Sequence, residues 1–310
     1  MGNISNESQL FVPENTKLTN SEDLKLLHLN TNMGLNVRDD IRDAVYGTLV
    51  FFGGKNPENI YKKANIENSV NPLVKEGADM IGLTEVFGKQ QVEKVREILE
   101  GKGYNTYVTP SFDMWSQDIE GEKLYNVEGF AKGTNEKLID TTEFYCNREG
   151  IGKLIALVNL LSGGKGNKNS VIEQSKHLQE RMKHIQDGAF TTFQVGDMNL
   201  THGHMHSDNP ELFKYLAQML YENQVIFGDF NIRDIPTTLL SNEMFNKYQH
   251  IFDYEDTYNF AKGVKHLPGI IKKPDTAISN GPKVNIETIG NTPEYGIVSD
   301  HAGLRLKITQ

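Results

Sequence analysis

The sequence predicts an α/β (α+β) protein in which mainly antiparallel strands are accompanied by amphipathic helices. Apolar runs of strand length occur at 24–30, 78–85 and 225–228. Between residues 104 and 161, short strand candidates are separated by Gly, Asn and Pro, a pattern typical of antiparallel sheets. Residues 89–103 instead place apolar side chains at helical spacing and include two glycines at their end, which predicts a surface helix.

The expected elements follow one another along a single domain. Residues 1–23 are polar and lack periodicity, which predicts a flexible N-terminal tail. No linker rich in Pro, Ser or Gly divides the remainder, so residues 24–310 are expected to form one domain. Further strands are expected at 104–110, 125–133, 136–145, 152–161, 190–202, 275–279 and 303–309, and further helices at 209–224 and around 237–248.

Composition and charge argue against a membrane-spanning protein, a secreted protein and a protein that binds phosphate polymers indiscriminately. Of the 310 residues, 37% are apolar and 24% charged, and no run of about 18 apolar residues is long enough to cross a membrane. No basic segment followed by an apolar stretch marks a secretory signal, and the single cysteine, Cys146, excludes an internal disulfide, which fits a cytoplasmic location without establishing it. The net charge of −9 argues against indiscriminate binding to phosphate polymers. The oligomeric state is left open.

Several predicted strands end in side chains that are costly to bury. The segment VIFGDFNIRD, residues 225–234, runs from apolar residues directly into Asp229 and Asn231, which alternation places on one side of the chain. Buried polar groups need partners, so repeated polar strand ends indicate one shared pocket. Carboxylate and amide oxygens suit Mg²⁺ or Mn²⁺, and a histidine beside a carboxylate suits proton transfer. The other polar ends are Asn30, Glu85 and His202, and the segment SDH at 299–301 precedes the last strand.

Taken in order, these polar residues form a known pattern. The chain carries HLNTNMG, LTEVF, NLTHG, GDFN, PDTAIS and SDH in succession. The set resembles that of the endonuclease/exonuclease/phosphatase superfamily, the deoxyribonuclease I-like metal-dependent phosphoesterases, over residues 24–308. A second copy of the GD-x-N motif, GDMN at 196–199, is set aside because the apolar run that should precede the motif precedes GDFN. The resemblance implies a four-layer αββα sandwich, with two central, mainly antiparallel sheets flanked by helices.

The resemblance further implies hydrolysis of a phosphoester that depends on Mg²⁺ or Mn²⁺. Glu85 would be the main metal ligand, supported by Asn30 and Asp300. In the first strand Asn32 is an alternative to Asn30, because the spacing to the following glycine is one residue longer than usual.

The resemblance also assigns catalytic roles. Asp229 would orient or deprotonate the attacking water, and Asn231 would help to position it. His301, tethered by Asp275, would bind the scissile phosphate and serve acid–base catalysis. His202 would stabilise the charge that develops on the phosphoryl oxygens.

The position of the strand histidine leaves two alternatives open. His204 lies two residues beyond His202. It is the alternative candidate for the catalytic strand histidine of the family, in case the match to the family motif is off by two positions. Because imidazoles two apart along a strand share a face, the segment HGHMH also permits a transition-metal site.

Nucleic acid is the leading candidate substrate, and DNA is preferred over RNA as the first candidate. The segment at 260–274 is rich in lysine and contains no acid, and it ends just before Asp275. Arg148, in CNREGIGK, resembles the segment with which deoxyribonuclease I meets the backbone of its substrate. Such phosphate contacts give affinity without reading sequence. The lysines expected to bind substrate are Lys262, Lys265, Lys272 and Lys273.

Three other functions remain open. Phe112, Met114 and Trp115 lie close together, as expected for an exposed aromatic hairpin in a sphingomyelinase-like lipid phosphodiesterase, although acidic residues flank them. Arg233 in GDFNIR fits a small-molecule or inositol phosphatase. The fold could also serve as a binding module without catalysis, although all the expected catalytic residue types are present.

Overall fold

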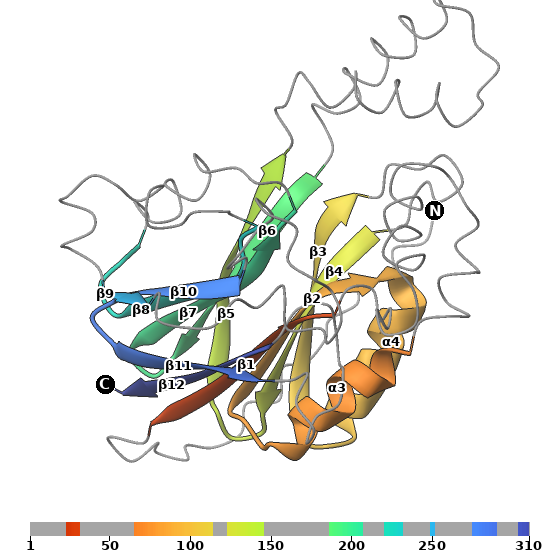
Figure 1. Ribbon diagram of the computed structural model, residues 1–310, viewed down its shortest axis with the longest axis horizontal. Helices are drawn as coiled ribbons and strands as arrows, with labels where there is room; N and C mark the ends of the chain where they lie inside the picture. The colour runs from red at the N-terminus through yellow and green to blue at the C-terminus, as the bar shows by residue number, and fades with distance from the viewer. Residues whose placement is uncertain are drawn as a thin grey trace, which may run out of the picture.

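Two β-sheets of six strands each face one another across an apolar core (Figure 1). The first sheet has the order β11-β12-β1-β2-β4-β3, with β1 Leu24–Asn30, β2 Met80–Phe87, β3 Tyr104–Asp113, β4 Lys123–Ala131, β11 Lys283–Ile289 and β12 Gly303–Thr309. The second has the order β5-β6-β7-β8-β10-β9, with β5 Glu136–Tyr145, β6 Gln186–Val195, β7 Met198–Met205, β8 Gln224–Asp229, β9 Gln249–Ile251 and β10 Asp275–Asn280. The computed structural model describes residues 23–31, 65–113, 123–145, 186–206, 220–231, 249–251, 275–289 and 303–309.

Strand pairing is mainly antiparallel, as predicted. Among the described strands, β1 pairs with β2 and β7 pairs with β8 in parallel, and the remaining pairs are antiparallel. Each parallel pair contains a strand that ends in a site residue, Asn30 in β1 and Asp229 in β8. Both parallel pairs therefore contain a strand whose last residue is polar and belongs to the candidate site.

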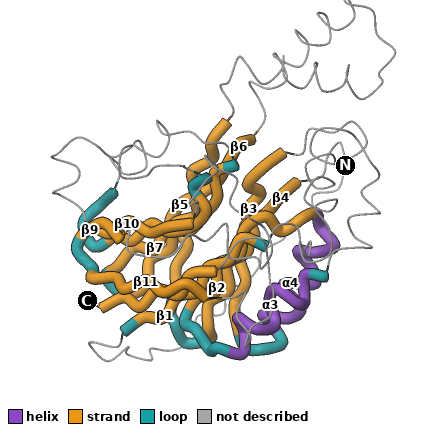
Figure 2. Tube along the Cα trace, viewed as in Figure 1, coloured by secondary structure: helices purple, strands orange, loops and turns teal. Residues whose placement is uncertain are grey.

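Alternation along β1 separates two apolar layers. Leu27 packs in a cluster with Val70 of helix α3 (Ile66–Lys75) and Val95 of helix α4 (Gly88–Glu100). Leu26, on the opposite face, packs with Phe227 in the cluster between the sheets. Both helices lie on one side of the strands (Figure 2). The predicted sandwich is confirmed, with helices covering the outer face of the first sheet.

Within the described residues, neither helix is long and apolar enough to span a membrane.

Several elements differ from the sequence-based expectation. The strand expected at 190–202 is two strands, because a hairpin turn at Gly196 and Asp197 reverses the chain, with φ of +59° at Gly196. Helix α3 was not predicted, because Pro72 and several polar residues interrupt its apolar pattern. Strand β11, also not predicted, is short and has no polar end to single it out.

Residues 220–224 do not form the end of the helix that was expected at 209–224. Asn223 adopts a left-handed φ of +56° in a turn, and β8 begins at Gln224. The rest of that helix, the helix around 237–248 and the strand at 152–161 fall outside the residues that the structure describes. So do residues 1–22, and the division into a tail and one domain remains a prediction.

A side chain of the second sheet reaches the backbone of the first sheet at Gly82 of β2. Gly82 lies in one row of the first sheet with His28 of β1 and Glu128 of β4. A Cβ atom at Gly82 would lie 2.5 Å from Nε2 of His202, which reaches across from β7 of the second sheet. The missing side chain therefore makes the space that the imidazole fills.

Gly82→Ala is expected to destabilise the protein by about 2–4 kcal/mol, because the new methyl group displaces a buried imidazole that is hydrogen-bonded on both sides. Urea unfolding measures the loss. Gly129→Ala is the matched control, since its Cβ would meet the end of the Leu99 side chain at 3.1 Å, where a small shift suffices. Equal losses in the two variants would contradict this account of Gly82.

Candidate active site

Site residues from both sheets meet at one end of the sandwich. In the second sheet, Asp275, Asp229 and His204 lie side by side in one row across β10, β8 and β7. In the first sheet, β1 ends at Asn30 and the neighbouring β2 carries Glu85. Asn30 Nδ2 donates to Asp229 Oδ2 at 2.7 Å, a buried hydrogen bond that joins the two sheets.

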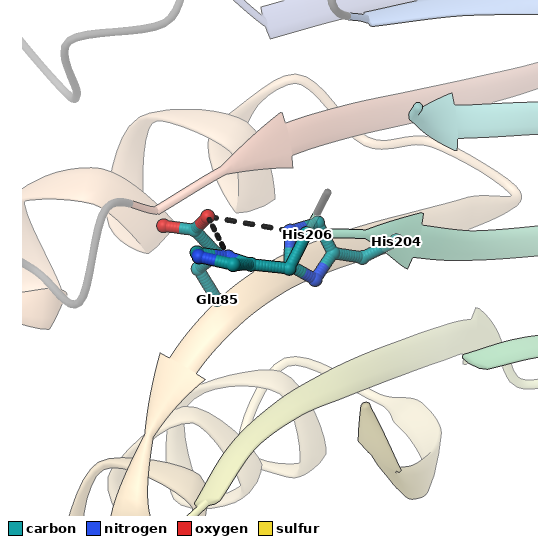
Figure 3. A group of neighbouring side chains, drawn as sticks. All are labelled: Glu85, His204 and His206. Atoms are coloured by element: carbon teal, nitrogen blue, oxygen red, sulfur yellow. Dashed lines mark ion pairs between the residues drawn. The ribbon is translucent and has the colours of Figure 1, made fainter. Parts of the chain in front are cut away.

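Glu85 reaches the second sheet because β2 is irregular at this point. Its φ is +55°, and the pairing of β2 with β4 shifts register between Leu83 and Val86. Figure 3 shows the carboxylate directed at two imidazoles from the end of β7. Oε1 of Glu85 lies 3.3 Å from Nε2 of His204 and 3.9 Å from Nδ1 of His206.

Asp229 and Asn231 form a compact turn at the end of β8. Asn231 has a φ of +50°, and its backbone N–H donates to Asp229 Oδ1 at 2.9 Å while its side chain donates to Met205 O at 2.8 Å. The preceding glycine is required as well, because a Cβ at Gly228 would lie 2.0 Å from the carbonyl oxygen of Gly203. The GDFN sequence therefore encodes a close backbone contact and a carboxylate held by its neighbours.

The site favours a positively charged group between its carboxylates. Burial opposes protonation of His204, but the hydrogen bond and charge of Glu85, together with the charges of Asp229 and Asp187, outweigh it and raise the pKa of His204. Partial burial lowers the pKa of His206, whose imidazole is therefore neutral near pH 7. A neutral imidazole and a carboxylate are both suitable metal ligands.

His202 lies elsewhere, which corrects its predicted place in the catalytic set. It is fully buried between the sheets, where Nδ1 is 2.8 Å from Glu128 Oε1 and Nε2 is 3.0 Å from His28 Nδ1. His28 Nε2 in turn is 2.9 Å from Asp275 Oδ1. His204, the alternative two residues on, is the histidine that contacts the site.

Hydrogen bonds link four buried side chains in series, and each side chain can donate to the next. The four are Glu128, His202, His28 and Asp275. Burial raises the pKa of Glu128 well above its ordinary value, and Glu128 Oε2 has no hydrogen-bond partner among the described residues, so the carboxyl group is protonated. Burial also lowers the pKa of His202 to about 3 and lowers that of His28. With Glu128 protonated and both imidazoles neutral, the tautomers that satisfy every contact have Glu128 donating to His202, His202 to His28, and His28 to Asp275.

Sequence reasoning missed His28 and Glu128 among the residues that build this region, whereas His206 was already part of the HGHMH segment considered as a transition-metal site. His28 precedes Asn30 by two positions, so strand alternation could have placed it on the same face. Glu128 interrupts the buried strand β4 and is fully buried, an arrangement that demands a partner. His206 shares the alternation of His202 and His204.

The structure also separates the two GD-x-N copies. Asp197 lies exposed in the turn between β6 and β7, whereas Asp229 is buried beside Asn30. The remaining predicted site residues fall outside the described part of the chain: Asn32, Arg148, Lys262, Lys265, Lys272, Lys273, Asp300 and His301.

Comparison with known proteins identifies the fold. No family model and no curated protein matches the chain. A solved endonuclease/exonuclease/phosphatase from Beutenbergia cavernae superposes with a TM-score of 0.56 at 14% identity, covering 93% of this chain and 71% of that one. This is the endonuclease/exonuclease/phosphatase fold.

Two further solved structures share this endonuclease/exonuclease/phosphatase architecture. The family protein from Leptotrichia buccalis has a TM-score of 0.53 at 15% identity, covering 92% of this chain and 99% of that one. TDP2 from Caenorhabditis elegans has a TM-score of 0.50 at 11% identity, covering 93% of this chain and 75% of that one. At these identities the likeness establishes the fold alone.

Glu128 is expected to make the folded protein less stable as the pH rises. Its raised pKa means that the folded chain retains a proton that the unfolded chain releases above about pH 4.5, so the free energy of unfolding falls by up to about 1.4 kcal/mol per pH unit. Glu128→Gln keeps the shape and can still donate to His202, but has no proton to retain. Urea unfolding between about pH 5 and 8 should show the variant gaining stability relative to wild type as the pH rises.

The lowered pKa values of His28 and His202 act in the opposite direction. Because the folded state resists protonation of these two histidines, wild type and Glu128→Gln both lose stability as the pH falls below about 6.5. The loss is the same in both proteins, so it cancels when their free energies of unfolding are subtracted. A difference between Glu128→Gln and wild type that stayed constant with pH would show that Glu128 is ionised in the folded state.

Proposed function

We propose that the protein is a divalent-metal-dependent phosphodiesterase, a hydrolase of phosphoester bonds that acts through an activated water. The observation that carries the proposal is the meeting of Asn30, Glu85, His204, Asp229 and Asn231 at one end of the sandwich. These residues come from four strands and the turn after β8. Burying so many polar groups together is costly unless they serve a site.

Asp229 is the group best placed to act on water. Its carboxylate is fully buried and held by Asn30 from one side and by the backbone and side chain of Asn231 from the other. A carboxylate fixed in this way can accept a proton from a water molecule or orient it toward phosphorus. Asn231, at the rim of the site, would help to position that water.

His204 would take the role that the resemblance assigned to His202. A protonated His204 offers positive charge and a donor to phosphoryl oxygens, where charge develops during transfer. Asp275 would tether His301, which would bind the scissile phosphate and serve acid–base catalysis. The hydrogen bond from His28 to Asp275 holds that carboxylate in place.

Glu85, with Asn30 and Asp300, would hold the divalent cation, for which Mg²⁺ or Mn²⁺ is the starting expectation. The carboxylate of Glu85 and the side-chain oxygen of Asn30 are oxygen ligands of the kind that these ions prefer. When bound, such an ion neutralises negative charge on the phosphoryl group.

Nucleic acid, with DNA first, is the proposed substrate. Arg148 and the lysines of the 260–274 segment would bind the phosphate backbone. The sphingomyelinase-like alternative is weakened, because Phe112 is fully buried and stacks on His206, so it cannot anchor in a membrane. A phosphatase acting on inositol phosphates or other small molecules would be detected by the same assays.

Asp229→Asn is expected to reduce turnover at least about 100-fold, because the amide keeps the shape but cannot accept a proton. The assay is nicking of supercoiled plasmid with Mg²⁺ or Mn²⁺, run beside sphingomyelin vesicles and a phosphomonoester, with EDTA to remove metal. Asp197→Asn is the matched control, since Asp197 occupies the same place in the exposed second motif.

Equal activity in these two variants would remove Asp229 from the mechanism. Wild-type activity that persists in EDTA would contradict metal dependence. Hydrolysis of sphingomyelin or of the monoester, without plasmid nicking, would assign one of the alternative substrates.

Replacing the four lysines of the 260–274 segment by alanine is expected to weaken DNA binding and to reduce its salt dependence. Each lost phosphate contact lowers the slope of log affinity against log salt by about 1. Turnover of a small phosphodiester should stay unchanged, because the reacting groups remain. An unaltered salt slope would exclude these lysines from the substrate interface.

A further inference from the structure

The end of β7 places two imidazoles beside the carboxylate that the fold would use for a hard cation. We propose that Glu85, His204 and His206 form a three-ligand site for a divalent transition-metal ion of the zinc type. The inference deepens the proposed function and depends on it for its catalytic meaning, but the binding of the ion can be measured on its own.

The distances between the ligand atoms suit one ion. Ligands at about 2.0–2.2 Å from a tetrahedral ion are about 3.3–3.6 Å from one another. Oε1 of Glu85 and Nε2 of His204 are 3.3 Å apart, and Oε1 of Glu85 and Nδ1 of His206 are 3.9 Å apart. All three atoms lie within 4.8 Å of each other, so shifts of an ångström or less complete the site.

The His206 ring is held where coordination needs it. It packs against Phe112 of β3, with ring centroids 4.0 Å apart and an angle of 33° between the planes. Its backbone N–H donates to the carbonyl oxygen of Asp187 at 2.9 Å, which continues the pairing of β7 with β6 by one residue. The side chain is 27% exposed, while its Nδ1 atom is buried on the side of Glu85.

The chemistry of the donors distinguishes this site from a magnesium site. Mg²⁺ prefers oxygen ligands and keeps most of its water, whereas imidazole nitrogen suits Zn²⁺ and its neighbours in the first transition row. Two imidazoles and one carboxylate are a ligand set of catalytic zinc sites, which leave a further position open for water or substrate.

His204 acts differently in the two states of the site. In the ion-bound state it is a ligand rather than a donor to phosphate, and the ion takes the place of its proton. Asn231 and His301 then remain for the phosphoryl oxygens. Asp229 Oδ2 lies 3.9 Å from His204 Nε2, farther than Glu85 Oε1 at 3.3 Å, and is left to act on the attacking water.

Isothermal titration calorimetry with the metal alone tests the site, using the full chain without substrate. Wild type is expected to bind one Zn²⁺ per chain. His206→Ala should weaken Zn²⁺ binding at least about 10-fold, the lower end of the effect of losing even a residue that only orients a ligand. Mg²⁺ binding should change little, because His206 contributes nothing that Mg²⁺ requires.

Two further variants make the result specific. His206→Asp replaces the nitrogen ligand by oxygen, and should lower the preference for Zn²⁺ over Mg²⁺ while keeping a third ligand. His250→Ala, in the edge strand β9, is the control for binding at other histidines and should leave Zn²⁺ affinity unchanged. Thermal unfolding without metal checks that each variant is folded.

The two proposals fail in different ways. Zn²⁺ affinity that is the same in wild type and His206→Ala would overturn the three-ligand site, whatever the enzyme hydrolyses. Tighter Zn²⁺ binding through His206, in a protein that hydrolyses no phosphoester, would support the site and overturn the proposed function. A preference for Zn²⁺ alone decides nothing, because most nitrogen and oxygen sites favour it, so the comparison between variants carries the test.

Discussion

The contact between the two sheets depends on a row of buried polar groups at its centre. Glu128, His202, His28 and Asp275 come alternately from the first and the second sheet, so the three hydrogen bonds that link them each cross between the sheets, and all four side chains are fully buried. Gly82 leaves the space for the His202 ring. Because strand side chains alternate, fixing His28 between the sheets also fixes Asn30 there, two residues on. The hydrogen bond from Asn30 to Asp229, and with it the site, follows from this alignment.

The backbone at the site is held in conformations that most residues avoid. Among the described residues, Glu85 and Asn231 have left-handed φ values of +55° and +50°. Each such conformation costs on the order of 1 kcal/mol or more and persists only where its surroundings hold it. Asn231 is held by its bonds to Asp229 and to Met205. Glu85 follows the irregular pairing of β2, which turns its carboxylate toward the histidines of β7. Of the four described non-glycine residues with a left-handed φ, these two therefore lie at the candidate site, and the other two, Asn135 and Asn223, lie in connections between strands.

Much of this arrangement could be predicted from the sequence, because polar ends of apolar strands are unusual and their order is specific. The bounds of β1, β5 and β12 were predicted from strand-length runs, turn residues and alternation. The polar strand ends predicted that Asn30, Glu85, Asp229 and Asn231 share one pocket. The choice between His202 and His204 could not be predicted. Both lie on one face of β7, and the parallel register that sets His204 beside Asp229 is a tertiary property. The buried chain was missed because no local pattern reveals that His28, Glu128 and His202 share partners.

His202 and His204 show how the fold separates a histidine buried between the sheets from one at the candidate site. They are two residues apart on the same strand, yet burial lowers the pKa of His202 to about 3 while Glu85 and Asp229 help to raise that of His204. The first imidazole meets a protonated carboxyl group and a second neutral imidazole, and the other meets carboxylates at the open end of the sandwich. One step of strand alternation thus carries the chain from a neutral network that joins the sheets to a charged site that can hold a cation. Substitutions at His202 should therefore act on stability, whereas those at His204 should act on binding and turnover.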